Sequence, residues 1–167
     1  MGATTGIEWA HATWNPHYGC RKVSQGCAKC YAERDMTRYG KTFSEVRRAS
    51  QKTFFAPVDW AKNGKLAPGS RIFTCSWSDW FIEEADEWRD EAWSVIARTP
   101  QFNYLILTKR PERMALRLPL GWGDGWPNVW LGVSVERQAE ADLRIPTLMN
   151  TPACVRFVSA EPLLGPI

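Results

Sequence analysis

The sequence predicts an α/β fold in which parallel strands form an open or partial barrel. Short apolar runs each follow a proline-containing turn, and helical patterns lie between them. The runs recur every ~25 to 30 residues, which is the length of a βα unit. Strands that alternate with helices in this way form a parallel sheet with right-handed crossovers.

Four strands are expected where β-branched and aromatic residues gather in short runs bounded by Pro or Gly. These runs are residues 71–75 (RIFTC), 102–107 (FNYLIL), 129–135 (VWLGVSV) and 155–159 (VRFVS). The N-terminal third is less regular, and we predict a short first strand there at residues 7–9.

Helices are expected in the segments between these strands. Residues 83–98 begin with acidic side chains, end with Arg98 and carry one apolar stripe, as the helix dipole and a buried face require. Pro111 suits the first turn of a helix. The predicted helices are residues 28–39 with Gly40 as C-cap, 44–63 in part with an interruption at Pro57, 83–98, 111–118, and 136–143 with a continuation past Pro146.

The length of the chain limits the size of the barrel. A closed eight-stranded barrel needs roughly 250 residues, whereas this chain has 167 residues and about five βα units. We expect a single domain over residues 1–167. No helix pattern follows the run at 155–159, so we expect that the C-terminus is truncated.

Composition excludes several classes of protein. No apolar run approaches the ~20 residues that span a membrane, and no signal peptide is readable, so we expect a cytoplasmic protein with no membrane partner. The net charge of +3 permits a polyanionic partner without requiring one. Five cysteines are an odd number, and three of them lie within eleven residues, which favours metal or redox chemistry over a disulfide scaffold.

The clustered cysteines predict a metal site in the loop over residues 17–31. Cys20, Cys27 and Cys30 follow a C-x6-C-x2-C spacing, with glycines that let the backbone fold closely around a cluster. Ordinary iron–sulfur and structural zinc sites have four protein ligands, so three cysteines leave one position open for a substrate or cofactor. Two alternatives remain, which are zinc with His11, His17 or Cys75 as fourth ligand, and reduced thiols without metal.

Other candidate residues follow the predicted strands. Function collects at the carboxyl ends of parallel strands, so the side chains after each strand should share one mouth with the cysteine loop. These residues are Ser78, Asp79, Lys109, Arg110, Ser134, Glu136 and Glu161. Each has a structural alternative: Asp79 can cap a helix, Glu136 can begin one, and the two cations can pair with nearby acids.

Several blocks of the sequence resemble the phage Gp37/Gp68 family, a group of radical-SAM-like proteins with a three-cysteine motif. The blocks span nearly the whole chain. They are residues 5–9 (TGIEW), 12–16 (ATWNP), 19–20 and 26–34 (the cysteine loop), 78–81 (SDWF), 107–113 (LTKRPER), 128–136 (NVWLGVSVE) and 156–165 (RFVSAEPLLG). Members of that family typically continue through a further strand, so the resemblance implies that the last unit is missing here.

The resemblance implies a partial (β/α)6 TIM-like barrel with a [4Fe–4S] cluster on Cys20, Cys27 and Cys30. It further implies that S-adenosylmethionine (SAM) binds the open iron and is cleaved reductively, with electrons from an electron donor. By charge, Lys109 or Arg110 would pair with the SAM carboxylate, while acidic residues would take its ammonium or ribose hydroxyls. Tyr31 would border the adenine.

The sequence leaves two functions open. The first is radical chemistry on an unknown substrate. The net positive charge and the aromatic loops favour a nucleic acid or a nucleotide as that substrate. The second is a non-catalytic, cluster- or zinc-bearing phage protein that binds a host protein or nucleic acid. In both readings, the protein acts in a bacterial or phage-infected cell.

Overall fold

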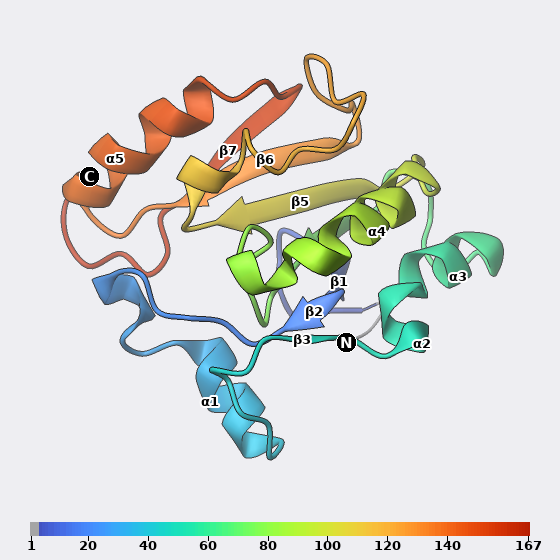
Figure 1. The fold of residues 1–167 in the computed structure, drawn as a ribbon, viewed down its shortest axis with the longest axis horizontal. Coiled ribbons are helices and arrows are strands. Elements are labelled where there is room, and N and C mark those ends of the chain that lie inside the picture. Colours follow the sequence, from blue (N-terminus) through green and yellow to red (C-terminus); the bar gives the residue numbers. More distant parts are fainter. Residues whose placement is uncertain (1–3) are drawn as a thin grey trace.

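The computed structural model describes residues 4–167 and contains an open, five-stranded parallel sheet (Figure 1). The first three residues of the predicted domain lie outside this range. The strand order is β1-β4-β5-β6-β7, and every neighbouring pair is parallel. The strands are β1 (Ala12–Trp14), β4 (Arg71–Thr74), β5 (Asn103–Thr108), β6 (Val129–Ser134) and β7 (Val155–Ser159). The α/β class and the parallel strands are confirmed, whereas the described residues form no closed barrel.

The helices lie where the chain crosses between strands. The longest are α4 (Asp86–Ala97), which lies across β5 in Figure 1, and α5 (Gln138–Met149), which lies beside β6 and β7. A 3-10 turn, η2 (Glu83–Ala85), precedes α4. The N-terminal third holds η1 (Gln25–Cys27), α1 (Tyr31–Arg38), α2 (Gln51–Phe54) and α3 (Ala56–Lys62), and a small antiparallel ribbon of β2 (His17–Tyr18) with β3 (Arg47–Arg48).

The first strand differs from the prediction at residues 7–9, because the chain pairs with β4 five residues later, at residues 12–14. Trp14 ends this strand and is fully buried, and its indole N–H donates to the carbonyl of Phe54 at 3.0 Å. Its ring also packs edge-on against Tyr104 of β5, at 5.8 Å between centroids. The register is therefore fixed by one large side chain rather than by an apolar run.

The predicted helix at 111–118 is also wrong, because only a 3-10 turn, η3 (Pro111–Arg113), forms there. The carbonyl of Arg117 accepts the indole N–H of Trp93 from α4 at 3.0 Å, so it is not used within a helix. In contrast, α5 runs through Pro146 and so contains the predicted continuation, at the cost of one hydrogen bond in the helix ladder.

Aromatic packing joins the helices to the sheet and leaves the carboxyl edge of the sheet open for a site. Trp80 and Trp93 meet at 4.9 Å between ring centroids, and Trp93 also contacts Trp122 and Trp126 of the loop before β6. This loop is therefore part of the core packing. No helix in the described part of the chain is long and apolar enough to cross a membrane.

Candidate functional site

A cavity of about 600 Å³ lies at the carboxyl edge of the sheet, and the cysteine loop forms part of its wall. Ten of the eleven residues predicted for the site line it: Cys20, Cys27, Cys30, Tyr31, Ser78, Asp79, Lys109, Arg110, Ser134 and Glu161. The eleventh, Glu136, is completely buried behind the loop. The carboxyl-end rule thus brings residues from β4, β5, β6 and β7 to one place.

The cysteine loop is fixed to its surroundings by its backbone. Gly19 has a φ of +92°, and a side chain there would overlap the carbonyl of Glu45, so the position requires glycine. The Cys20 N–H donates to the carbonyl of Phe43 at 2.8 Å, and the Ser78 hydroxyl donates to the carbonyl of Gly19 at 2.6 Å. The hydroxyl of Ser78, which was predicted to bind a cofactor, therefore donates its proton to the backbone of the cysteine loop.

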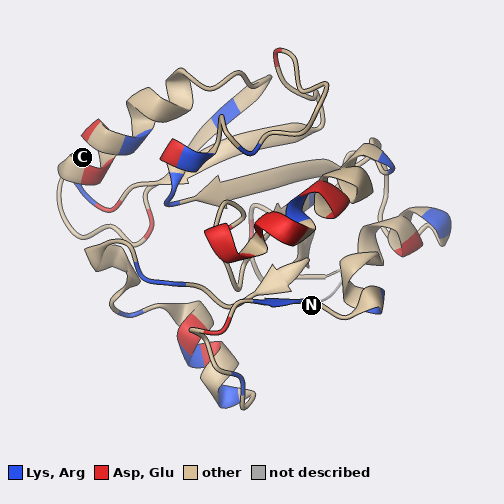
Figure 2. Cartoon of the chain, in the orientation of Figure 1, with Lys and Arg blue, Asp and Glu red and all other residues tan. Residues whose placement is uncertain are grey.

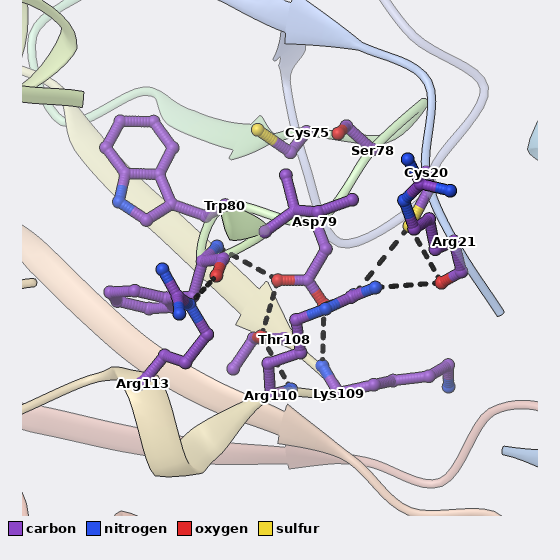
Figure 3. A network of polar contacts seen from close by, with 12 residues as sticks. Cys20, Arg21, Cys75, Ser78, Asp79, Trp80, Thr108, Lys109, Arg110 and Arg113 are labelled. Carbon is purple, nitrogen blue, oxygen red and sulfur yellow. Dashed lines mark hydrogen bonds and ion pairs between the residues drawn. The ribbon is translucent and has the colours of Figure 1, made fainter. Parts of the chain in front are cut away.

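Asp79 is a buried carboxylate whose oxygens are used within the protein (Figure 3). One oxygen accepts from the Thr108 hydroxyl at 2.6 Å and from the Phe81 N–H at 2.9 Å. The other accepts from the Lys109 N–H at 2.9 Å and pairs with Arg110 at 3.1 Å. Asp79 therefore holds the turn after β4 and ties it to β5. It does not cap a helix, because η2 begins at Glu83 with Ile82 as its N-cap.

Arg110 connects this carboxylate to the cysteine loop. Its guanidinium donates to the Arg21 carbonyl at 2.8 Å and lies 3.8 Å from the Cys20 sulfur. Burial raises the pKa of the Cys20 thiol to about 12, and the Asp79 charge acts in the same direction, while Arg110 opposes it. A metal at this thiol would displace its proton and restore the favourable pairing with Arg110.

Glu136 anchors the other end of the loop. Its oxygens pair with Lys109 at 2.7 Å and with Arg144 at 2.9 Å, and the Ser24 hydroxyl donates to it at 2.8 Å. Burial alone would raise the pKa of this carboxyl, but the contacts with Lys109 and Ser24 and the charge of Arg144 lower it below its usual value. A side chain at Gly26 would collide with the Glu136 carboxylate, so the loop packs directly on it.

The remaining predicted residues lie around the mouth of the cavity. Tyr31 is exposed, and it donates its hydroxyl to the Ser76 carbonyl at 2.9 Å. Glu161 is exposed, and its carboxylate makes no hydrogen bond or ion pair with residues 4–167. The Lys109 ammonium lies 3.4 Å from the backbone carbonyl of Glu161, so the lysine side chain reaches the segment that follows β7.

The donor set can be compared with what a metal requires. Across residues 4–167, no three His, Cys, Asp or Glu side chains converge closely enough to hold one ion. In a [4Fe–4S] cluster each thiolate binds a different iron, so the thiolates surround a larger body. Three cysteines on the wall of one cavity, with Lys22 and Lys29 also lining it, match the charge and chemistry of such a cluster.

The three candidates for a fourth ligand lie in different places. Cys75 lines the cavity in a left-handed conformation, with a φ of 57°, and its sulfur lies 3.6 Å from His17 Nε2. Burial lowers the pKa of His17 to about 4, so the ring is neutral, and Nε2 lies 3.1 Å from the Asp79 carbonyl. His11 precedes β1 at the amino edge of the sheet, where its ring accepts the Arg71 N–H at 2.9 Å.

Two residues that shape the site were not predicted from the sequence. Ser24 and Arg144 both contact Glu136, one from the cysteine loop and one from α5. A serine in a polar loop and an arginine in a polar helix carry no signal of burial. The fifth cysteine, Cys154, is exposed, and its thiol donates to the Gly125 carbonyl.

Together, the fold and the site define an α/β protein whose three-cysteine loop lies over the carboxyl edge of a parallel sheet. The chain belongs to the family described as "Protein of unknown function (DUF5131)", whose model matches residues 4–167. Searches of curated proteins and of solved structures returned no match.

Proposed function

We propose that Cys20, Cys27 and Cys30 hold a [4Fe–4S] cluster with one open iron, and that SAM binds this iron, as in radical SAM enzymes. The observation that carries the proposal is one cavity, which is lined by the three cysteines and by polar residues at or after the ends of four parallel strands. When bound, the cluster would supply the electron for reductive cleavage of SAM to methionine and a 5′-deoxyadenosyl radical. On this proposal, the open sheet is the curved wall of a partial (β/α)6 barrel.

Some residues of the site would hold other side chains in position, and the rest would bind SAM. Asp79 and Glu136 are saturated by internal donors, so they position Arg110 and Lys109 rather than binding SAM. The Glu161 carboxylate is available for the SAM ammonium, because its surroundings are open.

Two further groups suit the remaining parts of SAM. Lys109 is partly exposed at the cavity and can pair with the SAM carboxylate through the one N–H donor that Glu136 and the Glu161 carbonyl leave unused. Tyr31 lines the mouth and can lie against the adenine ring. An electron donor would have to reach the cluster from outside, past the exposed part of the cysteine loop.

Electron paramagnetic resonance on anaerobically reconstituted, dithionite-reduced protein tests the proposal. We expect a [4Fe–4S]⁺ signal that shifts when SAM is added and that is lost in Cys27→Ala. Cys154→Ala serves as the matched control, since this cysteine is exposed and lies outside the cavity, and its signal should equal that of the wild type. Release of 5′-deoxyadenosine under reduction would then be measured in the same samples.

A second function is favoured by the position of Cys75. Since Cys75 also lines the cavity, a fourth thiolate could close the site, and the chain would then be a non-catalytic cluster- or zinc-bearing binding protein. In that case the cluster signal would not respond to SAM in the wild type but would respond in Cys75→Ala. Stoichiometric zinc with no iron would exclude both cluster proposals.

A further inference from the structure

Positive charge gathers in one part of the chain. Residues 20–52 hold nine of the 21 Lys and Arg residues but only three of the 18 Asp and Glu residues, so the remainder of the chain is slightly acidic. In the structure this segment comprises the cysteine loop, α1 and β3, along which Figure 2 shows the basic residues. A polyanion would therefore be drawn to this part of the surface.

Part of this charge lies on helix α1, which extends away from the cavity. Ala32 and Met36 are buried on one face, whereas Tyr31, Arg34 and Arg38 are exposed at positions i, i+3 and i+7 on the other. Tyr31 lines the cavity, so the exposed stripe begins at the mouth and continues along the helix. Arg38 has no ion pair with any residue of the described range, which leaves its guanidinium for an outside anion.

Aromatic rings lie beside this stripe. Tyr39, which is 68% exposed, directly follows α1, and its ring lies 5.8 Å from that of Trp77 at an interplanar angle of 34°. The Lys41 ammonium lies 4.2 Å from the centre of the Tyr18 ring and 5.8 Å from that of Trp77. The neighbours of Trp77 on both sides in sequence line the cavity, so the aromatic group adjoins the same mouth.

We propose that this surface, formed by α1, Tyr39, Lys41 and Trp77, binds a single-stranded nucleic acid and leads it to the cavity mouth at Tyr31. Exposed rings interleaved with cations are the arrangement that binds unpaired bases by stacking and phosphates by charge. A base can stack on the free face of Tyr39 only if it is not already stacked in a duplex. The inference names the substrate class of the site above, so its chemistry rests on the proposed function, although binding itself does not.

The test is fluorescence anisotropy of the full, reconstituted chain with a fluorescein-labelled 12-mer of thymidylate, over a range of salt concentrations. We expect Tyr39→Ala to weaken binding by roughly tenfold, as loss of one stacking contact does, while Tyr39→Phe keeps the affinity. Arg38→Ala with Lys41→Ala should reduce the slope of log affinity against log salt by about 1.4, the value for two phosphate contacts on a single strand.

A charge-matched control separates specific contacts from general attraction. Lys62 and Lys65 are exposed at and just after the end of α3, away from α1 in Figure 1. Their double alanine variant removes the same charge and should change binding far less. Equal losses in the two double variants, or no loss in Tyr39→Ala, would overturn the proposal.

Two further outcomes distinguish this inference from its alternatives. If polyglutamate competes as well as the unlabelled 12-mer, the surface binds an acidic protein instead, and the inference fails. The response of the cluster signal to SAM is recorded on the same wild-type preparation. Binding of the 12-mer without that response would overturn the proposed function alone, and the response without binding would overturn the surface alone.

Discussion

Glu136→Gln removes the buried charge that fixes the cysteine loop to the sheet, while it keeps the shape of the side chain. The Glu136 side chain is 1% exposed and pairs with Lys109 and Arg144, whose side chains are 19% and 4% exposed. The amide retains an oxygen that can accept from Ser24, so the contact to the loop can persist. The substitution therefore tests the two ion pairs in particular.

The expected loss follows from the burial of the two cations. Removing one partner of a buried ion pair costs about 3–5 kcal/mol, because the other charge is left without compensation. Lys109 can turn toward the cavity, and Arg144 still donates to the Ser134 carbonyl at 2.7 Å, so the lower end applies. We expect a loss of about 3 kcal/mol, a large part of the ~5–15 kcal/mol that holds most domains folded.

Urea unfolding followed by tryptophan fluorescence measures this loss. The matched control is Glu140→Gln, the same chemical change in an ion pair with Arg137 at 3.0 Å, where the arginine side chain is 46% exposed. A surface pair of this kind contributes about 0.2–1 kcal/mol. If Glu136→Gln costs no more than Glu140→Gln at an unchanged urea slope, the buried ion pairs stabilise the fold no more than a surface ion pair does.

Three further predictions concern residues near the loop. Because burial lowers the pKa of His17 from 6.5 to about 4, the neutral ring contributes its full stability above pH 6.5, and the free energy of unfolding falls by about 3 kcal/mol as the pH drops to 4. In urea titrations, His17→Asn should lack this decline. The same pH dependence in the wild type and in His17→Asn would contradict the prediction. Gly26→Ala should lower the free energy of unfolding by about 1–3 kcal/mol, since the new Cβ meets the buried Glu136 carboxylate. The control Gly6→Ala, where a Cβ has open space, should stay within about 0.5 kcal/mol of the wild type. Iodoacetamide with mass spectrometry should modify exposed Cys154 before buried Cys75, and the reverse order would show that the cavity admits the reagent.

The strands were predictable wherever a short run of apolar and β-branched residues follows a turn that contains proline. The run at 155–159 is β7 without change. The runs at 71–75 and 129–135 extend one residue beyond β4 and β6, and the run at 102–107 is shifted by one residue from β5. The first strand was not predictable, because three residues carry no periodicity and Trp14 fixes their register by tertiary contacts. Propensity is overridden by packing in such short elements.

The candidate site could be predicted as a set of residues but not as a set of roles. The end of each strand could be located in the sequence, and the carboxyl-end rule then collected the polar residues around one cavity. Asp79, Glu136 and Glu161 are equivalent in that reasoning, since each is an acid after a strand. Their difference is one of burial and partners, which depend on residues as distant in sequence as Ser24 and Arg144.

That difference decides what the cavity can bind. The oxygens of Asp79 and Glu136 are occupied by donors of the chain, and through Arg110, Arg21 and Ser24 they hold the cysteine loop against the sheet. The loop is therefore held without help from a cofactor, so little ordering free energy is spent when a cofactor binds. The same saturation removes both acids from the ligand set. A cationic group entering the cavity would meet the Glu161 carboxylate, the one predicted acid that the described residues leave open at the mouth.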